Sequence, residues 1–142
     1  MGNESMKLAL KMGTKGVVFF ADMDFLKKIN DEYGHDMGDL AIKLEALIFK
    51  TVFRQNDIIA RLGGDEFAGI IPGLSISHIN KIKEKIKDTC EQISAENKLP
   101  YTISISFGAV EFNQENHNLE ALIKLADKEQ YLAKRQHHLE RK

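Results

Sequence analysis

The sequence contains one cysteine, Cys90, no tryptophan and two prolines in 142 residues. A single cysteine excludes an intramolecular disulfide and is typical of a reducing compartment, so we expect a buried, inert thiol and a cytoplasmic location. No apolar run approaches the roughly 20 residues of a membrane-spanning helix. Residues 1–16 also lack the apolar core and cleavage site of a signal peptide, so we expect no membrane segment in this fragment.

An excess of charge of one sign is missing as well. The chain has 20 Lys and Arg residues against 21 Asp and Glu residues, which gives a net charge of -1. A chain without a strong positive field has no general attraction to a nucleic acid polymer, so we expect no such partner. Hydrophobic residues make up 43% and charged residues 29% of the sequence, a balance typical of one globular domain.

The most informative stretch is the Gly63–Glu66 segment, Gly-Gly-Asp-Glu, which separates two short apolar runs at 58–62 and 67–71. Paired glycines between such runs predict a β-hairpin, because glycine reaches a positive φ without a steric penalty. Asp65 and Glu66 place two carboxylates side by side in the turn, and a divalent cation such as Mg²⁺ would relieve their repulsion. An ordinary solvated turn explains the same residues, so this stretch alone leaves both interpretations open.

The other elements follow from the hydrophobic pattern. An apolar run over residues 16–22 ends at Asp22 and predicts a buried central strand. A helix over 37–53 is predicted with a buried face formed by Leu40, Leu44, Leu47 and Ile48. The remaining predictions are a short helix over 23–30, a helix capped by Ser75 or Ser77, a strand over 101–112, and a helix from Asn118 through Leu132.

In chain order these elements are strand, helix, helix, strand, strand, helix, strand and helix (βααββαβα). This order predicts an α+β fold, an antiparallel β-sheet with flanking helices. A right-handed first crossover places the third strand between the first two and antiparallel to both. The end of the first strand then reaches the hairpin turn, where Asp22, Asp65 and Glu66 can converge. Such a carboxylate cluster suits two-metal phosphoryl or nucleotidyl transfer.

Five segments, taken in order, share motifs with one known family. They are Asp22-Met-Asp-Phe-Leu-Lys-Lys-Ile-Asn-Asp31, Tyr33-Gly-His-Asp-Met-Gly-Asp39, Gly63-Gly-Asp-Glu-Phe67, Ile103-Ser-Ile-Ser-Phe-Gly108, and Ala126-Asp127 with Tyr131-Leu-Ala-Lys134. Together they resemble GGDEF domains, the diguanylate cyclases that join two GTP molecules into cyclic di-GMP. The resemblance runs from about residue 16 to 135 and implies a ferredoxin-like, nucleotidyl-cyclase palm. It implies a catalytic domain over 16–136, an N-terminal extension or partial first helix over 1–15, and a polar tail over 137–142.

The resemblance implies that Mg²⁺ or Mn²⁺ is bound by Asp22, by Asp65 and by the carbonyl of Met23. Glu66 would be a second acid at the metal and would assist deprotonation of the attacking 3′-hydroxyl, so Asp65 and Glu66 are the implied catalytic residues. Asp24 is expected to be a structural partner or local cap instead of a ligand.

The resemblance also implies a GTP site. Asn30 and Asp39 would recognise guanine, whose edge an amide and a carboxylate can both match. The triphosphate would be held by the backbone around Phe25 and Leu26 and by the side chains of Lys27 and Lys134, and the backbone of Gly63 and Gly64 would lie beside the α-phosphate. Taken alone, each of these polar residues also fits an ordinary surface position.

Arg54-Gln-Asn-Asp57, just before the hairpin, resembles the R-x-x-D inhibitory site of the family. Cyclic di-GMP would bind there, away from the active site, because arginine stacks on purines and an aspartate accepts from a guanine edge. R-x-x-D by itself is common surface charge. Its distance from Gly63 matches the family pattern, so we expect Arg54 and Asp57 to bind product.

The chain departs from the family in three places. The opening L-T-x-L-x-N-R motif is not visible in residues 1–15, Gln136-His-His-Leu139 replaces G-R-N-R, and Glu129-Gln130 replaces a small-apolar pair. The favoured hypothesis is an active cyclase, in which two GGDEF domains face each other under the control of a sensor domain in a longer parent chain. The alternative is an inactive module that binds GTP or cyclic di-GMP as a receptor. A purely structural dimerisation module leaves the acidic turn unexplained.

Overall fold

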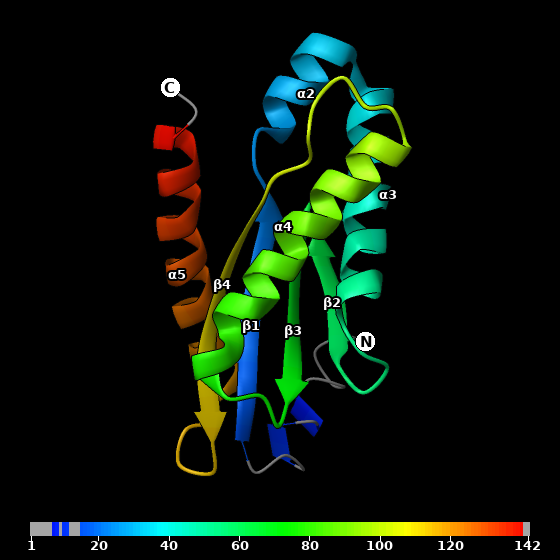
Figure 1. Cartoon of the computed structure of the whole chain (residues 1–142). Helices are drawn as coiled ribbons and strands as arrows, with labels where there is room; N and C mark the ends of the chain where they lie inside the picture. The colour runs from blue at the N-terminus through cyan, green and yellow to red at the C-terminus, as the bar shows by residue number, and fades with distance from the viewer. Residues whose placement is uncertain (1–6, 9, 12–14, 141–142) are drawn as a thin grey trace.

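The computed structural model describes residues 7–8, 10–11 and 15–140. Its elements are β1 (Lys15–Met23), α2 (Leu26–Tyr33), α3 (His35–Val52), β2 (Ile58–Gly63), β3 (Glu66–Pro72), a 3-10 turn (Ile76–His78), α4 (Ile79–Glu96), β4 (Ile105–Asn113) and α5 (Leu119–Glu140). The order of strands and helices is the predicted one, and the α+β class is confirmed (Figure 1).

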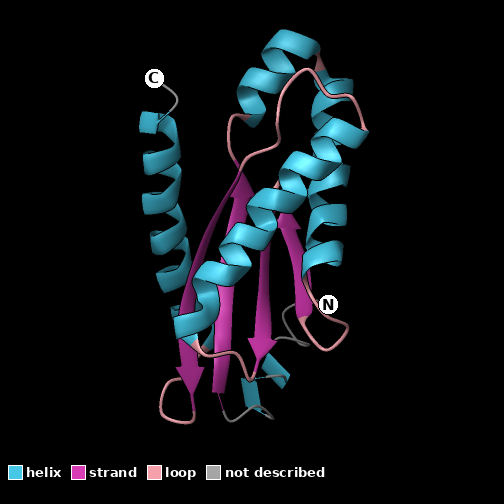
Figure 2. Ribbon diagram, viewed as in Figure 1, coloured by secondary structure: helices cyan, strands magenta, loops and turns pink. Residues whose placement is uncertain are grey.

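The four strands form one antiparallel sheet in the order β2-β3-β1-β4. β3 lies between β2 and β1 and is antiparallel to both, as the right-handed crossover predicted. β1 is paired on both edges, with β3 on one side and β4 on the other, and Figure 2 shows it in the interior of the sheet. This central strand therefore fixes the positions of the two chain segments on either side of it.

Helices cover both faces of the sheet. Val17, Phe19 and Ala21 of β1 point to the face covered by α3 and α4, while Val18 and Phe20 point to the face covered by α5. Phe19 stacks on Phe53 with ring centroids 4.8 Å apart and on Phe107 with ring centroids 5.0 Å apart. Figure 1 shows α3 and α4 together on one face and α5 on the other. A strand that is apolar on both faces is what the continuous run predicted.

The predicted buried face of α3 is partly wrong. Leu44 and Ile48 are buried, but 37% of Leu40 and 46% of Leu47 are exposed. The buried residues of this helix are Gly38, Ala41, Leu44, Glu45, Ile48, Phe49 and Val52. Leu40 and Leu47 each lie about 100° around the helix from the sheet-facing line of Ala41 and Ile48, so their hydrophobicity does not bury them.

Several predicted boundaries also move. β4 begins at Ile105, because residues 101–104 form no strand, and α5 continues to Glu140, beyond the predicted end near Leu132. Residues 137–140, expected in a polar tail, thus belong to α5, while residues 141–142 and most of 1–15 lie outside the described residues. The cap at Asn118 is confirmed, since its Oδ1 accepts from the N–H of Ala121 at 3.0 Å. Ser75 caps the 3-10 turn that precedes α4.

The expected thiol is confirmed as a buried group. Cys90 is 3% exposed on the inner side of α4, and burial raises its pKa to about 12, so it is a poor nucleophile. None of the described helices is both long enough and apolar enough to span a membrane.

Glu45 is the exceptional residue of the core. It has no exposed surface, and neither of its carboxylate oxygens has a hydrogen-bond partner among the described residues. Burial raises the pKa of Glu45 to about 9; the charges of Asp65 and Asp22 add to this rise, and those of Arg61 and Lys134 oppose it. At neutral pH the carboxyl is therefore protonated, which avoids an unpaired buried charge.

Replacing Glu45 by Met is expected to raise the free energy of unfolding at neutral and alkaline pH. A carboxyl whose pKa rises from 4.5 to about 9 on folding is neutral in both states below pH 4.5. Between pH 4.5 and about 9 it ionises in the unfolded state only, so the free energy of unfolding falls as the pH rises. At pH 7 the loss is roughly 3 kcal/mol. Methionine has a similar volume and no ionisable group, so Glu45→Met should remove this pH dependence.

Urea unfolding across this pH range measures both effects. Glu91→Gln, an exposed position on α4, is the matched control and should keep the wild-type pH profile. A Glu45→Met variant whose stability declines with pH as the wild type does would show that another group is responsible.

Candidate functional site

The acidic turn contacts the end of β1 directly. The N–H of Met23 donates to Oδ2 of Asp65 at 3.0 Å. The turn has this shape because Gly64 adopts a φ of +49°, and the Arg61 guanidinium donates to the Gly64 carbonyl at 2.7 Å. A side chain at Gly64 would be strained in that conformation. The predicted contact between the end of β1 and the hairpin turn is confirmed, and it is made by this hydrogen bond from Met23 to Asp65.

Two side chains of α5 approach the same strand end from the other face of the sheet. Lys134 Nζ lies 3.1 Å from Oδ1 of Asp22 and 3.2 Å from the carbonyl of Met23. Gln130, 3% exposed and one helical turn earlier, donates its amide N–H to the same Oδ1. Burial raises the pKa of Asp22 to about 6, and the negative charges of Asp65 and Asp24 add to this rise. The charge and the hydrogen bond of Lys134 lower the pKa and offset part of it.

α5 reaches Asp22 because Gly108 of β4 lacks a side chain. A Cβ on Gly108 would lie 2.2 Å from the carbonyl oxygen of Ala126 and 2.2 Å from the backbone nitrogen of Gln130. The helix backbone therefore rests directly on the strand. This close approach brings Gln130 and Lys134, four residues apart on one helical face, within reach of Asp22.

Asp24 lies deeper and has a separate set of partners. Its carboxylate accepts from the hydroxyls of Ser104 and Ser106, both at 2.6 Å, and lies 2.7 Å from Nδ1 of His137. Burial opposes ionisation, but the hydrogen bonds from His137, Ser104 and Ser106 outweigh it and hold the pKa of Asp24 below its ordinary value. Asp24 is a structural partner that fastens the end of α5 to the sheet.

A family model described as "Diguanylate cyclase, GGDEF domain" matches residues 3–139. The chain belongs to the GGDEF domain family. Its curated relatives include the probable diguanylate cyclase DgcT of Escherichia coli (strain K12), 32% identical over 120 residues that cover 82% of this chain and 26% of DgcT. The diguanylate cyclase DosC of the same strain is 34% identical over 129 residues, which cover 89% of this chain and 28% of DosC. The chain thus spans little more than a quarter of the length of these relatives.

Solved structures support the same fold. The GGDEF domain of DgcB from Caulobacter crescentus, in complex with c-di-GMP, superposes with a TM-score of 0.81 at 26% identity, covering 94% of this chain and 82% of that one. The fold described above is therefore that of a GGDEF domain.

The end of β1 presents oxygens of the chemical kind that a divalent cation binds. The two oxygens closest to the Lys134 ammonium, Asp22 Oδ1 and the Met23 carbonyl, are among those that the resemblance assigns to the metal, so they already face a positive charge. An all-oxygen donor set suits Mg²⁺ or Mn²⁺. No group of three His, Cys, Asp or Glu side chains within the described residues is arranged to hold a metal ion, and Glu66 is exposed. The whole ligand set, Asp22, Asp65, Glu66 and the Met23 carbonyl, stays a prediction.

The residues expected to bind guanine lie on two successive helices. A Cβ on Gly38 would lie 1.7 Å from Oδ1 of Asn30, so this glycine allows α2 to lie against α3 just before Asp39. Phe25 adopts a φ of 64° ahead of α2 and stacks on His138, with ring centroids 4.5 Å apart. The exposed Lys27 is in the first turn of α2, beside Leu26. Asn30 and Asp39 thus lie on adjacent packed helices, and their binding of guanine stays a prediction.

Arg54 and Asp57 lie in the turn between α3 and β2. The backbone N–H of Arg54 donates to Oδ2 of Asp57 at 2.8 Å, and the N–H of Asp57 donates to the Arg54 carbonyl at 3.0 Å. The aspartate therefore stabilises the turn, while the Arg54 side chain is exposed. None of the hydrogen bonds or ion pairs found among the described residues joins this pair to Asp22 or Asp65, and product binding at Arg54 and Asp57 stays a prediction.

Sequence analysis missed two side chains of the site. Gln130 was noted only as a departure from the family pattern, and His137 was assigned to a polar tail. Both lie on the line of α5 that includes Lys134, at spacings of four and three residues. Helical spacing from Lys134 points to both residues, but it can be applied only if the last helix continues past Leu132, which the sequence did not predict.

Replacing Gly108 by Ala is expected to lower the free energy of unfolding by about 3 kcal/mol or more, since the new methyl group meets backbone that cannot yield locally. Movement of α5 should also separate Lys134 from Asp22. Gly63→Ala is the matched control, because nothing lies within 4 Å of a Cβ at that glycine. Urea denaturation measures the free energy of unfolding of both variants. Equal stability of Gly108→Ala and Gly63→Ala would contradict the close contact between α5 and β4.

Proposed function

We propose that this GGDEF domain, over residues 16–136, is a diguanylate cyclase that condenses two GTP molecules into cyclic di-GMP and two pyrophosphates. The observation that carries the proposal is the junction at Met23. The N–H of Met23 donates to the Asp65 carboxylate, and the Met23 carbonyl lies with Asp22 beside the Lys134 ammonium. The curated relatives named as diguanylate cyclases support the same activity.

Asp22, Asp65 and the Met23 carbonyl would hold Mg²⁺ or Mn²⁺, with Glu66 as a second acid. The cation would neutralise charge on the α-phosphate and the leaving pyrophosphate. Asp65 would also keep the turn fixed against β1, and the exposed carboxylate of Glu66 would accept the proton of the attacking 3′-hydroxyl. In each of two steps, the 3′-oxygen of one GTP would form a bond to the α-phosphorus of the other. The bond between that α-phosphorus and the leaving pyrophosphate would break in the same step.

The substrate would be held by groups on either side of this junction. Asn30 and Asp39 would bind the guanine edge, and the backbone near Phe25 and Leu26 would hold the phosphates. Lys27 and Lys134 would add point charges for phosphate oxygens, with Gly63 and Gly64 beside the α-phosphate.

Each domain would hold one GTP, so catalysis needs a second GGDEF domain facing the first. The exposed position of the acidic turn supports this arrangement, since a bound α-phosphate there is open to a partner. A sensor domain in a longer parent chain would then set activity by bringing two copies together.

Incubation of concentrated protein with GTP and Mg²⁺, followed by chromatographic product analysis, tests the proposal. Cyclic di-GMP should form at a specific rate that rises with protein concentration. Asp65→Ala should lose at least 100-fold in rate, because it removes both a metal ligand and the contact to Met23, while circular dichroism reports whether it stays folded. Product formation by Asp65→Ala at the wild-type rate would refute the assignment.

A second candidate is a receptor for cyclic di-GMP, favoured by the exposed Arg54 side chain on a turn that Asp57 already holds in shape. Calorimetry with cyclic di-GMP should show binding that Arg54→Ala weakens on the order of tenfold or more, since a charge-assisted fork to guanine or phosphate is lost. Lys50→Ala, a nearby exposed cation on α3, is the control. Binding without turnover of GTP would favour the receptor over the enzyme, and equal binding by Arg54→Ala would remove Arg54 from the site.

A further inference from the structure

Lys134 contacts two of the oxygens that are also proposed to bind the cation. Its Nζ lies 3.1 Å from Oδ1 of Asp22, with which it forms an ion pair, and 3.2 Å from the carbonyl oxygen of Met23. A divalent cation on the same two oxygens would stand beside this ammonium, and like charges that close repel strongly in a partly buried site. Lys134 and the cation therefore cannot both keep these contacts at full strength.

The Lys134 side chain has room to leave Asp22, whereas its neighbour Gln130 does not. The side chain of Lys134 is 29% exposed, so its ammonium can turn towards solvent or a ligand. Gln130 is 3% exposed, its backbone rests on Gly108, and its amide donates to the same oxygen of Asp22. If Lys134 left, Asp22 would keep this donor, and the carboxylate would stay oriented.

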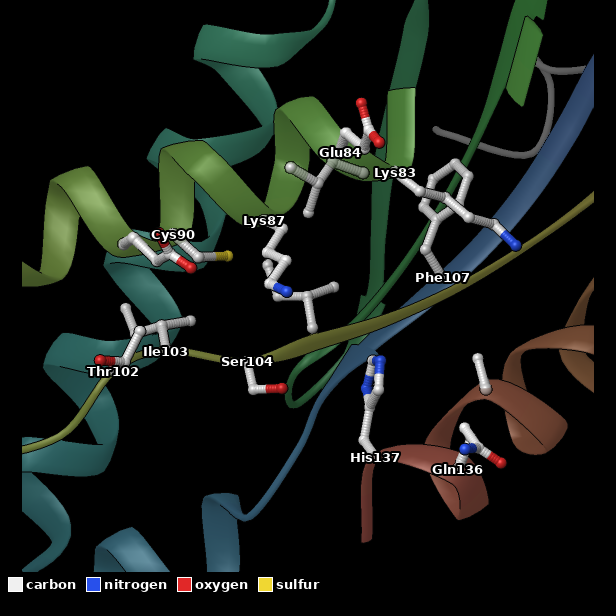
Figure 3. Close-up of a pocket in the computed structure, with 14 residues that line it drawn as sticks. Lys83, Glu84, Lys87, Cys90, Thr102, Ile103, Ser104, Phe107, Gln136 and His137 are labelled. Atoms are coloured by element: carbon white, nitrogen blue, oxygen red, sulfur yellow. The ribbon is translucent and has the colours of Figure 1, made fainter. Parts of the chain in front are cut away.

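The helix that carries Lys134 is also fixed one turn later. Nδ1 of His137 lies 2.7 Å from Oδ2 of Asp24, a carboxylate that is 1% exposed. Figure 3 shows the His137 ring pointing from α5 towards the sheet, near Ser104. α5 is therefore held at Gln130 and at His137, on either side of Lys134. A change in the contacts of Lys134 is then a movement of one side chain and not of the helix.

We propose that Lys134 competes with the divalent cation for Asp22 and the Met23 carbonyl, and that it moves to the nucleotide phosphates when the cation binds. This exchange rests on the proposed function, which supplies both the cation and the nucleotide. Phosphate oxygens would give the displaced ammonium a new partner. The two ligands would then favour each other beyond their direct contact, because the nucleotide draws Lys134 away from oxygens that the cation needs.

Titration of the whole chain with Mn²⁺ in the absence of nucleotide, followed by the electron paramagnetic resonance signal of free Mn²⁺, tests the competition. Lys134→Met removes the charge at similar side-chain length, so it should bind Mn²⁺ about fivefold more tightly than the wild type, or better. Lys134→Gln, also neutral, should do the same. Adding Asp22→Asn to Lys134→Met should abolish the gain. Lys128→Met removes the same charge from an exposed position on another side of α5 and should change the affinity by less than about twofold.

Calorimetry with 3′-deoxy-GTP at saturating Mg²⁺ tests the move to the phosphates. This nucleotide lacks the attacking hydroxyl, and saturating Mg²⁺ removes the competition, so only the phosphate contact of Lys134 is measured. Lys134→Met should bind it about fivefold more weakly, or worse. Charge removal thus has opposite effects on the two ligands, which a loss of folding would not produce.

The exchange is overturned if neither Lys134 variant binds Mn²⁺ more tightly than the wild type, or if Lys134→Met binds 3′-deoxy-GTP as tightly as the wild type does. Either result stands whether or not the wild type forms cyclic di-GMP. Tighter Mn²⁺ binding and weaker nucleotide binding by Lys134→Met, with no cyclic di-GMP formed by the wild type, would instead refute the cyclase and support the exchange.

Discussion

The hydrogen bond from the Met23 N–H to the Asp65 carboxylate joins the acidic turn to the end of β1. β1 is apolar on both faces and paired on both edges, so its end is the first place along the strand where polar groups can gather. Lys134 reaches the carbonyl of the same residue from the other side of the sheet, because Gly108 lets α5 rest on β4. Three segments far apart in the sequence therefore meet at the main chain of one residue, and the proposed nucleotide chemistry depends on that meeting.

Three acids near this point have different pKa values, because burial acts on all three while their hydrogen-bond donors differ. Asp24 is almost fully buried but accepts hydrogen bonds from two serines and lies against His137, and its pKa is lowered. Asp22 has Lys134 and Gln130 on one oxygen, and its pKa rises to about 6. Glu45 has no hydrogen-bond donor among the described residues, and its pKa rises to about 9. Burial raises the pKa of each acid, and hydrogen-bond donors decide how far that rise is offset. A neutral Glu45 also keeps one negative charge away from the acids proposed to bind the cation.

Much of the fold was predictable because its signals are local. A continuous apolar run marks a strand buried on both faces, paired glycines mark the hairpin, and Asn118 marks the start of α5. The exposed positions of Leu40 and Leu47 were not predictable, since hydrophobicity alone does not say which side of a helix faces the sheet. Nor was the burial of Glu45, an acid on the inner side of α3, where periodicity would place an apolar residue. The extension of α5 beyond Leu132 escaped prediction because residues 136–138 are polar, and the sheet contact that orders His137 comes from Asp24, more than a hundred positions earlier.

The sequence by itself determined the family, the order of the elements and the meeting of the β1 end with the Gly63–Glu66 turn, because strand pairing and crossover handedness leave few alternatives. Only the tertiary structure decided how the site is supported. Gln130 and Lys134 reach Asp22 through the missing side chain at Gly108, and Asp24 takes its donors from β4 and α5. These contacts depend on distances of a few ångströms between packed elements, which no periodicity along the chain encodes.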